Sequence, residues 1–517
     1  MRSAIIIDGY VDEPAVLGVP PYVSTYPRYI AGTLFLKDFD VRYTTIDEVR
    51  KKEQWDSFNE YDVLVIISGV TVPGRYIGGT PITLKEIEKI FSKNKKPFRI
   101  LTGAVLQNSR EVLKNIGADE FVEDFIEYAF ETNNYEIKRT VAVEGARIVK
   151  YHPRFPDIIC EIEVSLGCER KNYCTFCSEP ILHKGFSSRP LKDIVDEIEA
   201  LYKAGVKAFR LGRSANILAY GMEKNSGKVN NNLIYELYNS IRNVAPQLEV
   251  LHTDNANPAF IARNYPEIVN ALETIVKYNT EGDVLSFGVE SFDPYVRKRN
   301  NIDGTVEEID FAIKIVNEIG KVRTRNGIPK LLPGLNFIFG LPGEKKRSYE
   351  ILYEKLNNYL CDNILIRRIN LRQVIVVPET PLWFYSKRKK IKFDHRLFKH
   401  YKYLIRNKID IEMIKRVFPI GTRIKNVIPE YHEGKLTFAR PLGTYPILVG
   451  IPAHLDKKRD ILVVGYGPRS LTGIRADIKI SEATMDELMA IPGIGRKTAE
   501  TIKAKAPESL VNTLLGG

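Results

Sequence analysis

The chain has 517 residues and a formal net charge of +12, and hydrophobic residues make up 44% of it. This length predicts three or four domains, and the hydrophobic content is ordinary for a globular protein. No apolar run approaches the roughly 20 residues that a membrane span needs, so we expect no membrane segment. Three of the five cysteines lie between positions 168 and 177, which argues against a disulfide framework and favours a cytoplasmic protein.

Residues 1–150 alternate short apolar runs with helical stretches, which predicts an open, doubly wound α/β sheet. Ligands of such sheets bind beyond the carboxyl ends of the strands, which here carry Asp8-Gly9-Tyr10 and Ser68-Gly69-Val70. The expected strands are Ala4–Ile7, Val41–Thr45, Val63–Ser68 and Arg99–Thr102, and the expected helices include Thr83–Asn94, with Thr83 as N-cap, and Arg110–Ile116.

The stretch Ser165–Pro190 contains Cys168, Cys174 and Cys177 in the spacing Cys-x5-Cys-x2-Cys. Thiolates are soft ligands, and three of them close together suit either zinc or an iron–sulfur cluster. No fourth cysteine is placed to close a structural zinc site, although His183 could serve as its fourth ligand. The spacing therefore leaves two interpretations, a four-iron cluster with one open iron and a zinc site completed by His183.

The motifs Gly167-Cys168, Cys174–Cys177 and Ser188-Arg189-Pro190 resemble the cluster loop of the radical S-adenosylmethionine (radical SAM) superfamily, most closely that of the tRNA methylthiotransferases. The superfamily usually has three residues between its first two cysteines, whereas this chain has five. Over nearly its whole length the chain is similar to an archaeal group of radical SAM proteins that end in a helix-hairpin-helix motif. That resemblance implies no particular substrate.

The resemblance implies a [4Fe-4S] cluster whose open iron binds the amino and carboxylate groups of S-adenosylmethionine. One electron, delivered by a donor such as ferredoxin or flavodoxin, would cleave the sulfonium. The resulting 5′-deoxyadenosyl radical would take a hydrogen atom from the substrate, while the protein positions the reactants and excludes water.

Residues 155–382 alternate strands and helices in the manner of the partial (βα)6 barrel of this superfamily, in which chemistry occurs at the carboxyl ends of the strands. The expected strands are Cys160–Ser165, Phe209–Gly212, Leu248–His252, Val284–Gly288, Leu335–Phe339 and Arg372–Val376. The resemblance assigns the cofactor contacts to Phe176, Gly212, Arg213, Asn255, Glu290, Ser291, Gly340, Leu341, Pro342 and Gly343. Each of these residues taken alone is equally compatible with a plain turn or a barrel-wall contact.

Many radical SAM enzymes carry a cobalamin-binding domain shaped like the sheet expected in residues 1–150. In its common form a histidine ligates the cobalt, but the first histidine of this chain is His152. Residues 1–150 contain no cysteine either, which excludes the second cluster of the methylthiotransferases. The domain is therefore expected either to cover the active site without a cofactor or to bind cobalamin without a histidine ligand.

Residues 383–426 carry 14 Lys and Arg against three acidic residues, and aromatic residues stand between them. Such a segment can pair with phosphates and stack on unpaired bases. The alternative is an amphipathic helix that packs its aromatics inward, because Phe398, Tyr401 and Ile405 have helical spacing.

Residues 427–477, with the preceding run Ile424–Ile428, predict a small β-barrel. Its other expected strands are Thr437–Ala439, Ile447–Gly450 and Ile461–Tyr466, and Arg440, Arg469 and Arg475 could face a ligand. Residues 478–517 contain a helix-hairpin-helix pattern. Its Pro-Gly-Ile-Gly turn predicts contact of Gly493, Gly495, Arg496 and Lys497 with backbone phosphate, without base specificity.

The sequence thus favours a radical SAM enzyme that modifies a nucleic acid, RNA in the first instance. Two alternatives stay open. One is a radical SAM enzyme that acts on a protein, a lipid or a small molecule. The other is a nucleic-acid-binding protein whose cluster is structural and which has no enzymatic activity.

Overall fold

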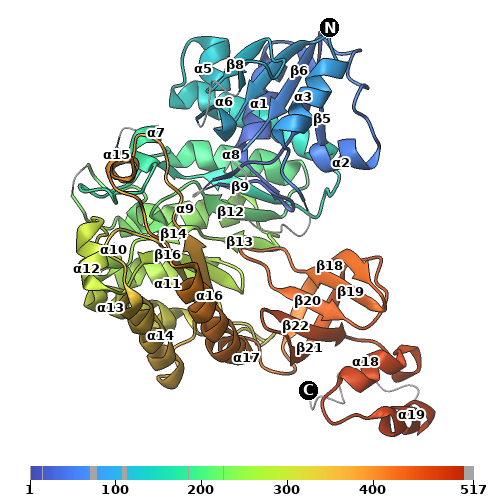
Figure 1. Ribbon diagram of the computed structural model, residues 1–517. Coiled ribbons are helices and arrows are strands. Elements are labelled where there is room, and N and C mark those ends of the chain that lie inside the picture. The colour runs from blue at the N-terminus through green and yellow to red at the C-terminus, as the bar shows by residue number, and fades with distance from the viewer. Residues whose placement is uncertain are drawn as a thin grey trace. The chain divides into compact units, whose positions relative to one another are not determined.

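The computed structural model describes residues 2–13, 16–69, 79–107, 113–183, 185–224 and 226–505 (Figure 1). The chain forms two compact units. Unit 1 comprises Met1–Leu166, Phe186–Tyr220 and Asn232–Leu251, and unit 2 comprises Gly167–Gly185, Gly221–Asn231 and His252–Gly517. None of the described helices is long and apolar enough to cross a lipid bilayer.

Unit 1 begins with a five-stranded parallel sheet in the order β5-β1-β6-β7-β8. Counted along the chain, this order is 2-1-3-4-5, the doubly wound topology in which the strand order reverses between β1 and β6. The predicted sheet is confirmed with all four of its expected strands, and the short β8 was missed. The strands are β1 (Arg2–Asp8), β5 (Phe39–Thr45), β6 (Val63–Ile67), β7 (Phe98–Thr102) and β8 (Glu120–Val122).

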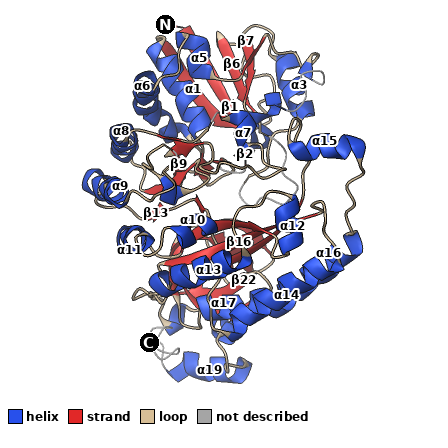
Figure 2. Ribbon diagram, turned by 90° about the vertical axis from the view of Figure 1, so that its left-hand side faces the viewer, coloured by secondary structure: helices blue, strands red, loops and turns tan. Residues whose placement is uncertain are grey.

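Helices cover both faces of this sheet, with α3 on one side and α1, α5 and α6 on the other (Figure 2). The helix α3 begins after Thr83 as predicted, because Thr83 and Glu86 form a capping box. The expected helix Arg110–Ile116 lies largely outside the described residues. The helices are α1 (Thr25–Leu36), α2 (Ile46–Lys51), α3 (Leu84–Lys93), α5 (Phe125–Phe130) and α6 (Tyr135–Gly145), with the 3-10 turns η1 (Ala104–Gln107) and η2 (Ala146–Tyr151).

The helices α1 and α6 approach each other at two glycines. A Cβ atom on Gly32 would lie 1.9 Å from the carbonyl oxygen of Val141, and one on Gly145 would lie 1.9 Å from that of Arg28. A side chain at either position would therefore force the two helices apart.

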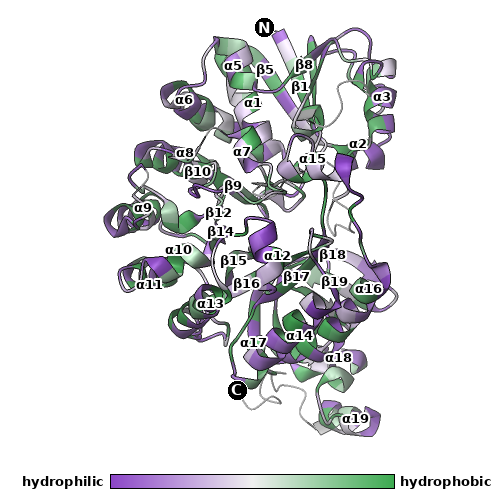
Figure 3. Ribbon diagram, turned by 60° about the vertical axis from the view of Figure 1, so that its left-hand side comes forward, coloured by the Kyte–Doolittle hydropathy of each residue, from purple (hydrophilic) through white to green (hydrophobic). Residues whose placement is uncertain are grey.

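A second sheet of unit 1 has the order β13-β12-β9-β4 and contains the first three strands of the predicted barrel. Its outer helices α8 and α9 carry hydrophobic and hydrophilic residues together, as Figure 3 shows. The elements of this part are β4 (Tyr22–Val23), β9 (Ile159–Glu163), β12 (Ala208–Gly212), β13 (Val250–His252), α8 (Leu191–Lys203), η3 (Ile217–Ala219) and α9 (Asn231–Val244). Two short antiparallel pairs are β2 (Asp12–Glu13) with β3 (Val16–Leu17), and β10 (Ser165–Leu166) with β11 (Ser187–Ser188).

Unit 2 contains the other three predicted barrel strands, β15, β16 and β17, in a parallel sheet of order β14-β15-β16-β17. The two-residue β14 at the edge of this sheet was not predicted. The last strand, β17, begins four residues before its predicted start. The apolar run Val374–Val377 suggested a later strand, whereas the buried positions are Ile369 and Leu371. The elements are β14 (Asn255–Ala256), β15 (Asp283–Glu290), β16 (Leu331–Phe339), β17 (Arg368–Gln373), α10 (Pro258–Arg263), α11 (Ile268–Tyr278), α12 (Pro294–Arg299), α13 (Val306–Gly320) and α14 (Lys346–Cys361).

The rest of unit 2 is a helical segment, a closed five-stranded barrel of order β18-β19-β20-β22-β21, and a helical hairpin. The four expected barrel strands are present, and β22 was missed. The helices are α15 (Pro381–Arg388), α16 (His395–Leu404), η4 (Ile405–Asp410), α17 (Ile411–Val417), η5 (Ile480–Glu482), α18 (Met485–Ala490) and α19 (Arg496–Lys505). The strands are β18 (Arg423–Glu433), β19 (Leu436–Arg440), β20 (Leu448–Ile451), β21 (Arg459–Tyr466) and β22 (Ser470–Arg475).

Candidate functional site

The three clustered cysteines share one loop of unit 2, which ends in the short helix α7 (Glu179–Leu182). A turn joins two of them, because the backbone N–H of Cys177 donates to the carbonyl of Cys174 at 3.1 Å. Cys174 is buried in an apolar cluster with Val296 and Leu341, and Phe176 packs against that cluster. The structure thus brings Phe176 and Leu341, two predicted cofactor contacts, beside the cysteine loop.

Burial raises the pKa of all three thiols, that of Cys177 to about 12. Arg170, which sequence reasoning did not single out, offsets this effect: its Nη1 lies 3.5 Å from Cys174 Sγ. Arg170 is one of the five residues between Cys168 and Cys174, where the family usually has three. This unusual spacing was the only sequence feature that could have drawn attention to Arg170. A cation held among thiols favours their deprotonated, ligating form.

The cysteine loop is also held by polar contacts to the residues after β14. The amide of Asn257 donates to Glu169 at 3.0 Å and to Asp303 at 3.2 Å. The predicted contact Asn255 lies two residues earlier, in β14, where it pairs with Ser286 of β15. Asn257 therefore joins the strand end to the cysteine loop.

Glu290, at the carboxyl end of β15, is a buried carboxylate with an unsatisfied oxygen. Its Oε2 has no hydrogen-bond partner among the described residues, and its backbone has a φ of 60°. Burial raises the pKa of Glu290 to about 7, although the charges of Arg170, Arg297 and Arg372 oppose the rise. A buried polar atom without a partner is costly, so this oxygen indicates a place for a donor from a ligand.

The turn that follows Glu290 is fixed from within unit 2. Arg297 donates from Nη1 to the carbonyls of Val289 at 2.7 Å and Ser291 at 2.9 Å. The Ser291 hydroxyl accepts from the backbone N–H of Asp293 at 3.1 Å, just before α12 begins. Arg297 was not predicted, since no local motif marks an arginine that supports a turn from the next helix.

The next strand end, Gly340–Gly343 after β16, needs its glycines. Gly340 and Gly343 have φ values of 89° and 97°, in the left-handed region that favours glycine. The backbone N–H of Gly340 donates to both carboxylate oxygens of Glu344 at 3.1 Å. The Pro342 carbonyl accepts from Asn300 at 2.9 Å, and Asn300 also accepts a bond from Thr175 in the cysteine loop.

The remaining predicted cofactor contacts, Gly212 and Arg213, belong to unit 1. A Cβ atom on Gly212 would lie 2.1 Å from Glu161 Oε1, so the strand needs glycine there. Arg213 has a φ of 50°, and its Nε lies 3.6 Å from Glu163 Oε2. Burial raises the pKa of Glu163, but Lys138, Arg213 and Arg189 outweigh it and lower that pKa to about 2.

Arg189, from the Ser-Arg-Pro motif, has a structural role. Its guanidinium pairs with Glu197, which also pairs with Arg28, and all three side chains are at most 1% exposed. The carbonyl of Arg189 accepts from Tyr220 Oη at 3.0 Å. The motif thus fixes α8 within unit 1 through a buried ion-pair network.

Asp8 lies at the end of β1, where the strand order of the N-terminal sheet reverses, and both of its carboxylate oxygens accept hydrogen bonds from the protein. Its two oxygens accept from the Tyr10 backbone N–H at 2.9 Å and from Tyr43 Oη at 2.8 Å. Burial raises the pKa of Asp8 to about 6 despite these bonds. The other strand end predicted as a ligand site in this sheet was Ser68-Gly69-Val70, and Val70 lies outside the described residues.

His152, the first histidine of the chain, packs against this sheet, with its ring 6.0 Å from that of Tyr43. It is 3% exposed, and burial together with Arg154 lowers its pKa to about 3, so the ring is neutral. Its Nδ1 accepts from the backbone N–H of Arg154 at 3.1 Å.

The basic aromatic segment contains both buried and exposed rings. Phe398 and Tyr401 pack inward against Phe339 and Tyr349, as the alternative interpretation expected. Phe384 and Tyr403 are 53% and 65% exposed. Part of the aromatic set is therefore core, and part is available to a ligand.

The helical hairpin is fastened to the barrel. Arg475 of β22 donates to both carboxylate oxygens of the buried Glu487 in α18, at 2.7 and 2.6 Å. Gly493 has a φ of 84°, while Arg496 and Lys497 are exposed. The hairpin turn therefore presents backbone and cations to the solvent, as a phosphate-binding turn requires.

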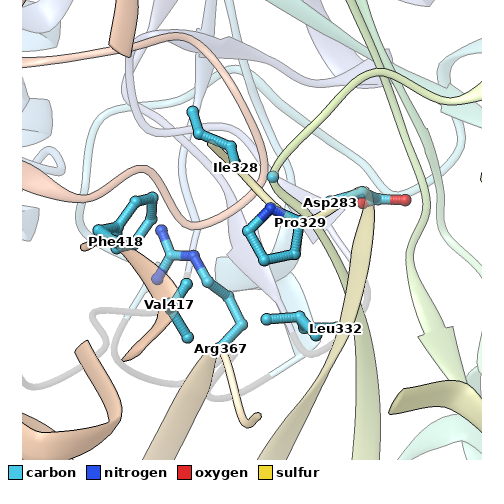
Figure 4. A pocket seen from close by; sticks show the side chains of 8 residues that line it. Asp283, Ile328, Pro329, Leu332, Arg367, Val417 and Phe418 are labelled. Carbon is cyan, nitrogen blue, oxygen red and sulfur yellow. The ribbon is translucent and has the colours of Figure 1, made fainter. Parts of the chain in front are cut away.

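A small crevice lies at the amino-terminal ends of the unit 2 strands, opposite the predicted cofactor contacts (Figure 4). The guanidinium of Arg367 lies over the Phe418 ring, 5.0 Å from its centre. The lining residues are Gly282, Asp283, Ile328, Pro329, Leu332, Arg367, Val417 and Phe418. This mainly apolar lining is typical of a packing contact between the sheet and the end of α17.

Two family models match the chain. The Radical SAM superfamily model matches residues 162–356, and the helix-hairpin-helix motif model matches residues 478–505. An uncharacterized protein of Archaeoglobus fulgidus is 38% identical and covers 100% of both chains. An uncharacterized protein of Methanocaldococcus jannaschii is 39% identical, over 91% of this chain and 92% of its own.

More distant matches cover less of the chain. The ribosomal protein uS12 methylthiotransferase RimO of Mannheimia succiniciproducens is 25% identical over 43% of this chain and 46% of its own. The tRNA-2-methylthio-N(6)-dimethylallyladenosine synthase of Lawsonia intracellularis is 24% identical over 39% of this chain and 40% of its own. Membership of the superfamily implies S-adenosylmethionine and an iron–sulfur cluster. The chain belongs to the radical SAM superfamily of enzymes and, within it, to one group with these two archaeal proteins.

Proposed function

We propose that this enzyme holds a [4Fe-4S] cluster on Cys168, Cys174 and Cys177, binds S-adenosylmethionine beside it, and modifies RNA. The observation that carries the proposal is the pairing of a three-cysteine loop with the unsatisfied oxygen of Glu290 in one compact unit. The bound amino acid end of S-adenosylmethionine offers the donor that this oxygen lacks.

The donor set fits a cluster better than a single metal ion. Among the described residues, only His432, His454 and Asp456 are grouped so that three His, Cys or carboxylate ligand atoms could share one ion. The three cysteines and His183 form no such group, which argues against the zinc alternative. Three thiolates spread over one loop suit a cubane with an iron left open.

When bound, the reduced cluster and S-adenosylmethionine together supply a 5′-deoxyadenosyl radical that takes a hydrogen atom from the substrate. The chain's own residues prepare this chemistry. Arg170 stabilises the thiolates by its charge, and Glu290 accepts from the methionine end. The glycines after β16 let the backbone approach the adenine closely. Phe176 packs against the apolar cluster of Cys174, Val296 and Leu341 beside that turn. For Gly212 and Arg213, which belong to unit 1, a role in cofactor binding stays a prediction of the family resemblance.

The nucleic-acid part of the proposal is supported by the C-terminal region of unit 2. The hairpin presents the exposed cations Arg496 and Lys497 at the start of α19, beside a glycine turn. Positive charge at such a turn favours backbone phosphate. The exposed Phe384 and Tyr403 add surfaces on which unpaired bases can stack.

Binding to bulk tRNA at several salt concentrations tests this proposal. The double substitution Arg496→Glu and Lys497→Glu should weaken binding and reduce the log–log salt slope, by roughly 0.7–0.9 for each phosphate that the hairpin no longer binds. Lys457→Glu, an exposed lysine of the barrel, is the matched control and should change the slope less. Point substitutions suit this purpose better than truncation, because the hairpin shares an apolar core with β21 and β22.

The partial similarity to a ribosomal protein methylthiotransferase favours a second candidate, a radical SAM enzyme that acts on a protein. That candidate predicts a flat salt response of tRNA binding in the unsubstituted chain, together with production of 5′-deoxyadenosine that RNA does not stimulate. The same two measurements therefore separate the candidates.

A further inference from the structure

Two histidines and an aspartate meet on the outside of the five-stranded barrel of unit 2. His432 lies in β18, while His454 and Asp456 follow β20. One ligand atom from each of them lies within 4.8 Å of the other two. The two rings are stacked with their centres 4.0 Å apart, and His454 Nε2 lies 3.1 Å from Asp456 Oδ1. These three exposed residues, the histidine cluster, therefore offer ligand atoms to one point on the surface.

The ring of His432 is hydrogen-bonded to a buried residue of the neighbouring strand. The hairpin between β18 and β19 turns at Gly434, whose φ is 58°, and the register of the two strands pairs His432 with Thr437. Thr437 is fully buried, and its Oγ1 lies 3.0 Å from His432 Nδ1. An exposed ring is thus fixed by a side chain that has no contact with the solvent.

The hydrogen bonds of Thr437 decide which nitrogen of His432 carries the proton. The hydroxyl donates to the Ala453 carbonyl at 2.6 Å and accepts from the Leu455 backbone N–H at 3.1 Å. A hydroxyl has one proton and two lone pairs, so only a lone pair is left for His432. The Nδ1 atom must therefore donate, and the neutral ring keeps its own lone pair on Nε2. In this tautomer a histidine can ligate a metal ion through Nε2.

The same hydroxyl also positions His454, because its other two partners flank that residue. Ala453 and Leu455 are buried in the core of the barrel, whereas His454 and Asp456 are exposed. This alternation directs the side chains of His454 and Asp456 outward together. One buried hydroxyl thus fixes the ring of His432 and the backbone on both sides of His454.

Stability does not account for this arrangement. A polar contact between exposed side chains contributes little to the free energy of unfolding, and His454 and Asp456 are 68% and 78% exposed. A histidine whose second nitrogen donates to a fixed acceptor is instead typical of a metal ligand. Around a tetrahedral zinc ion, nitrogen and oxygen ligands at about 2.0–2.1 Å lie about 3.3 Å from one another. The 3.1 Å contact between His454 and Asp456 is close to this spacing, and small rotations of the side chains would bring in the third ligand.

We infer that the histidine cluster binds a divalent transition-metal ion, with zinc as the first choice and Thr437 as the positioning residue. Two imidazoles and one carboxylate are ligands that zinc accepts readily. Three protein ligands leave one position of a tetrahedral site for water or for an oxygen of a bound molecule. The ion would join β18 to the chain after β20. The inference goes beyond the proposed function and does not depend on it, because no residue of the candidate cofactor site takes part.

Calorimetric titration of the anaerobically reconstituted full chain with zinc chloride tests the inference. The unsubstituted chain should bind one zinc ion through the histidine cluster, and X-ray absorption should show nitrogen and oxygen ligands at about 2.0–2.1 Å. His454→Ala should weaken this binding more than about 100-fold, since loss of an outer-shell partner alone costs roughly 10- to 100-fold. His400→Ala is the matched control, because His400 is an exposed histidine of α16, and it should leave the affinity unchanged.

Two further variants test the role of Thr437. Thr437→Val removes the hydroxyl and should weaken zinc binding roughly 10- to 100-fold, whereas Thr437→Ser keeps a hydroxyl and should retain most of the affinity. If Thr437 only stabilised the barrel, Thr437→Val would lower the melting temperature without changing the zinc affinity of the folded protein, and the positioning role would be wrong. Because His454 is exposed, His454→Ala keeps the test valid if Thr437→Val impairs folding.

The metal site is wrong if the unsubstituted chain binds no zinc, if His454→Ala binds zinc as tightly as the unsubstituted chain, or if His400→Ala weakens binding as much as His454→Ala does. It is also wrong if all the bound zinc has sulfur ligands at about 2.3 Å and is lost in Cys177→Ala, because the ion then lies on the cysteine loop. That last result would contradict the proposed cluster as well. The other failures would leave the cluster and the RNA proposal untouched.

Discussion

Two carboxylates stand at the carboxyl ends of parallel strands in the two units of this enzyme, and they differ in how their oxygens are hydrogen-bonded. Asp8 ends β1 and Glu290 ends β15, both in parallel sheets whose strand ends are the usual place for a site. Burial raises the pKa of both, to about 6 and about 7. Asp8 accepts from Tyr10 and Tyr43, whereas one oxygen of Glu290 has no partner among the described residues.

The difference shows that a polar strand end becomes a candidate site through its unmet hydrogen bonds. Position and raised pKa alone do not distinguish the two carboxylates. Asp8 stabilises the sheet around it, and its environment is complete without a ligand. Glu290 has the bonding deficit that a cofactor can fill, and it stands beside a cysteine loop.

The largest effect is expected at the three cysteines that are proposed to hold the cluster beside Glu290. Anaerobic reconstitution should give about four iron and four sulfide per chain if Cys168, Cys174 and Cys177 ligate one cubane. Alanine at any one of the three should abolish the cluster and the cleavage of S-adenosylmethionine. Iron and sulfide analysis with the visible spectrum of the reconstituted protein measures this change.

Two further cysteines provide the controls for this experiment. Cys361 is exposed and Cys160 is buried in β9, so neither Cys361→Ala nor Cys160→Ala should lower the iron content. Stoichiometric zinc bound through sulfur in strictly anaerobic preparations of the unsubstituted protein would contradict the cluster and restore the zinc interpretation.

Matched alanine substitutions at the two carboxylates test the comparison directly. Glu290→Ala should weaken binding of S-adenosylmethionine roughly 10- to 100-fold, the value of a hydrogen bond to a charged group, and leave the cluster in place. Arg213→Ala should act in the same direction. Asp8→Ala should leave the cofactor affinity unchanged but lower the stability of the N-terminal sheet by about 1–3 kcal/mol, because Tyr43 loses its acceptor.

Calorimetry of cofactor binding and thermal denaturation of each variant give the two readouts. The comparison would be wrong if Asp8→Ala weakened cofactor binding as much as Glu290→Ala does. It would also be wrong if Glu290→Ala left the affinity unchanged.

A smaller effect concerns pH. The pKa of Asp8 is about 6 in the folded chain against 3.8 for an ordinary aspartate, so the folded state binds the proton more tightly. The contribution of Asp8 to stability is therefore greatest below pH 4 and falls as the pH rises toward 7, by about 3 kcal/mol at most. Asp8→Asn should remove this share of the pH dependence of the melting temperature. An unchanged pH profile in Asp8→Asn would show that Asp8 ionises normally.

The smallest expected effect is at His152. Because His152 is buried against Tyr43 and is the first histidine of the chain, we expect no cobalamin with a histidine ligand in the N-terminal domain. Electron paramagnetic resonance of protein reconstituted with cobalamin measures this. Nitrogen superhyperfine coupling from a protein histidine would contradict the prediction, and His152→Phe would identify its source.

Local patterns in the sequence predicted much of the fold. Apolar runs predicted most strands of the sheets and of the barrel, and Thr83 as an N-cap predicted the start of α3. The sequence misplaced β17, since an apolar run after the strand outweighed the alternation of Ile369 and Leu371. It missed β8 and β22, which are defined by their partners across the sheet more than by their own residues.

The candidate site was predictable where chemistry depends on a motif, as at the three cysteines. Arg170 was marked only by an unusual spacing, and Arg297 by nothing local. Their roles depend on side chains from distant segments, and no window of sequence brings those segments together. Arg189 is the opposite case: the sequence marked it through a family motif, but in the structure it belongs to a buried ion-pair network.

The bond between Arg475 and Glu487 has a consequence for how the hairpin could have been acquired. A helix-hairpin-helix motif at the end of a chain resembles a module that could be exchanged between proteins. Here, however, the acceptor Glu487 lies in the hairpin and the donor Arg475 lies in the last strand of the barrel. A transplanted hairpin would leave an unpaired arginine behind and carry a buried, unpaired glutamate to its new host. The unit of inheritance, and of any domain-grafting experiment, is therefore the barrel and the hairpin together.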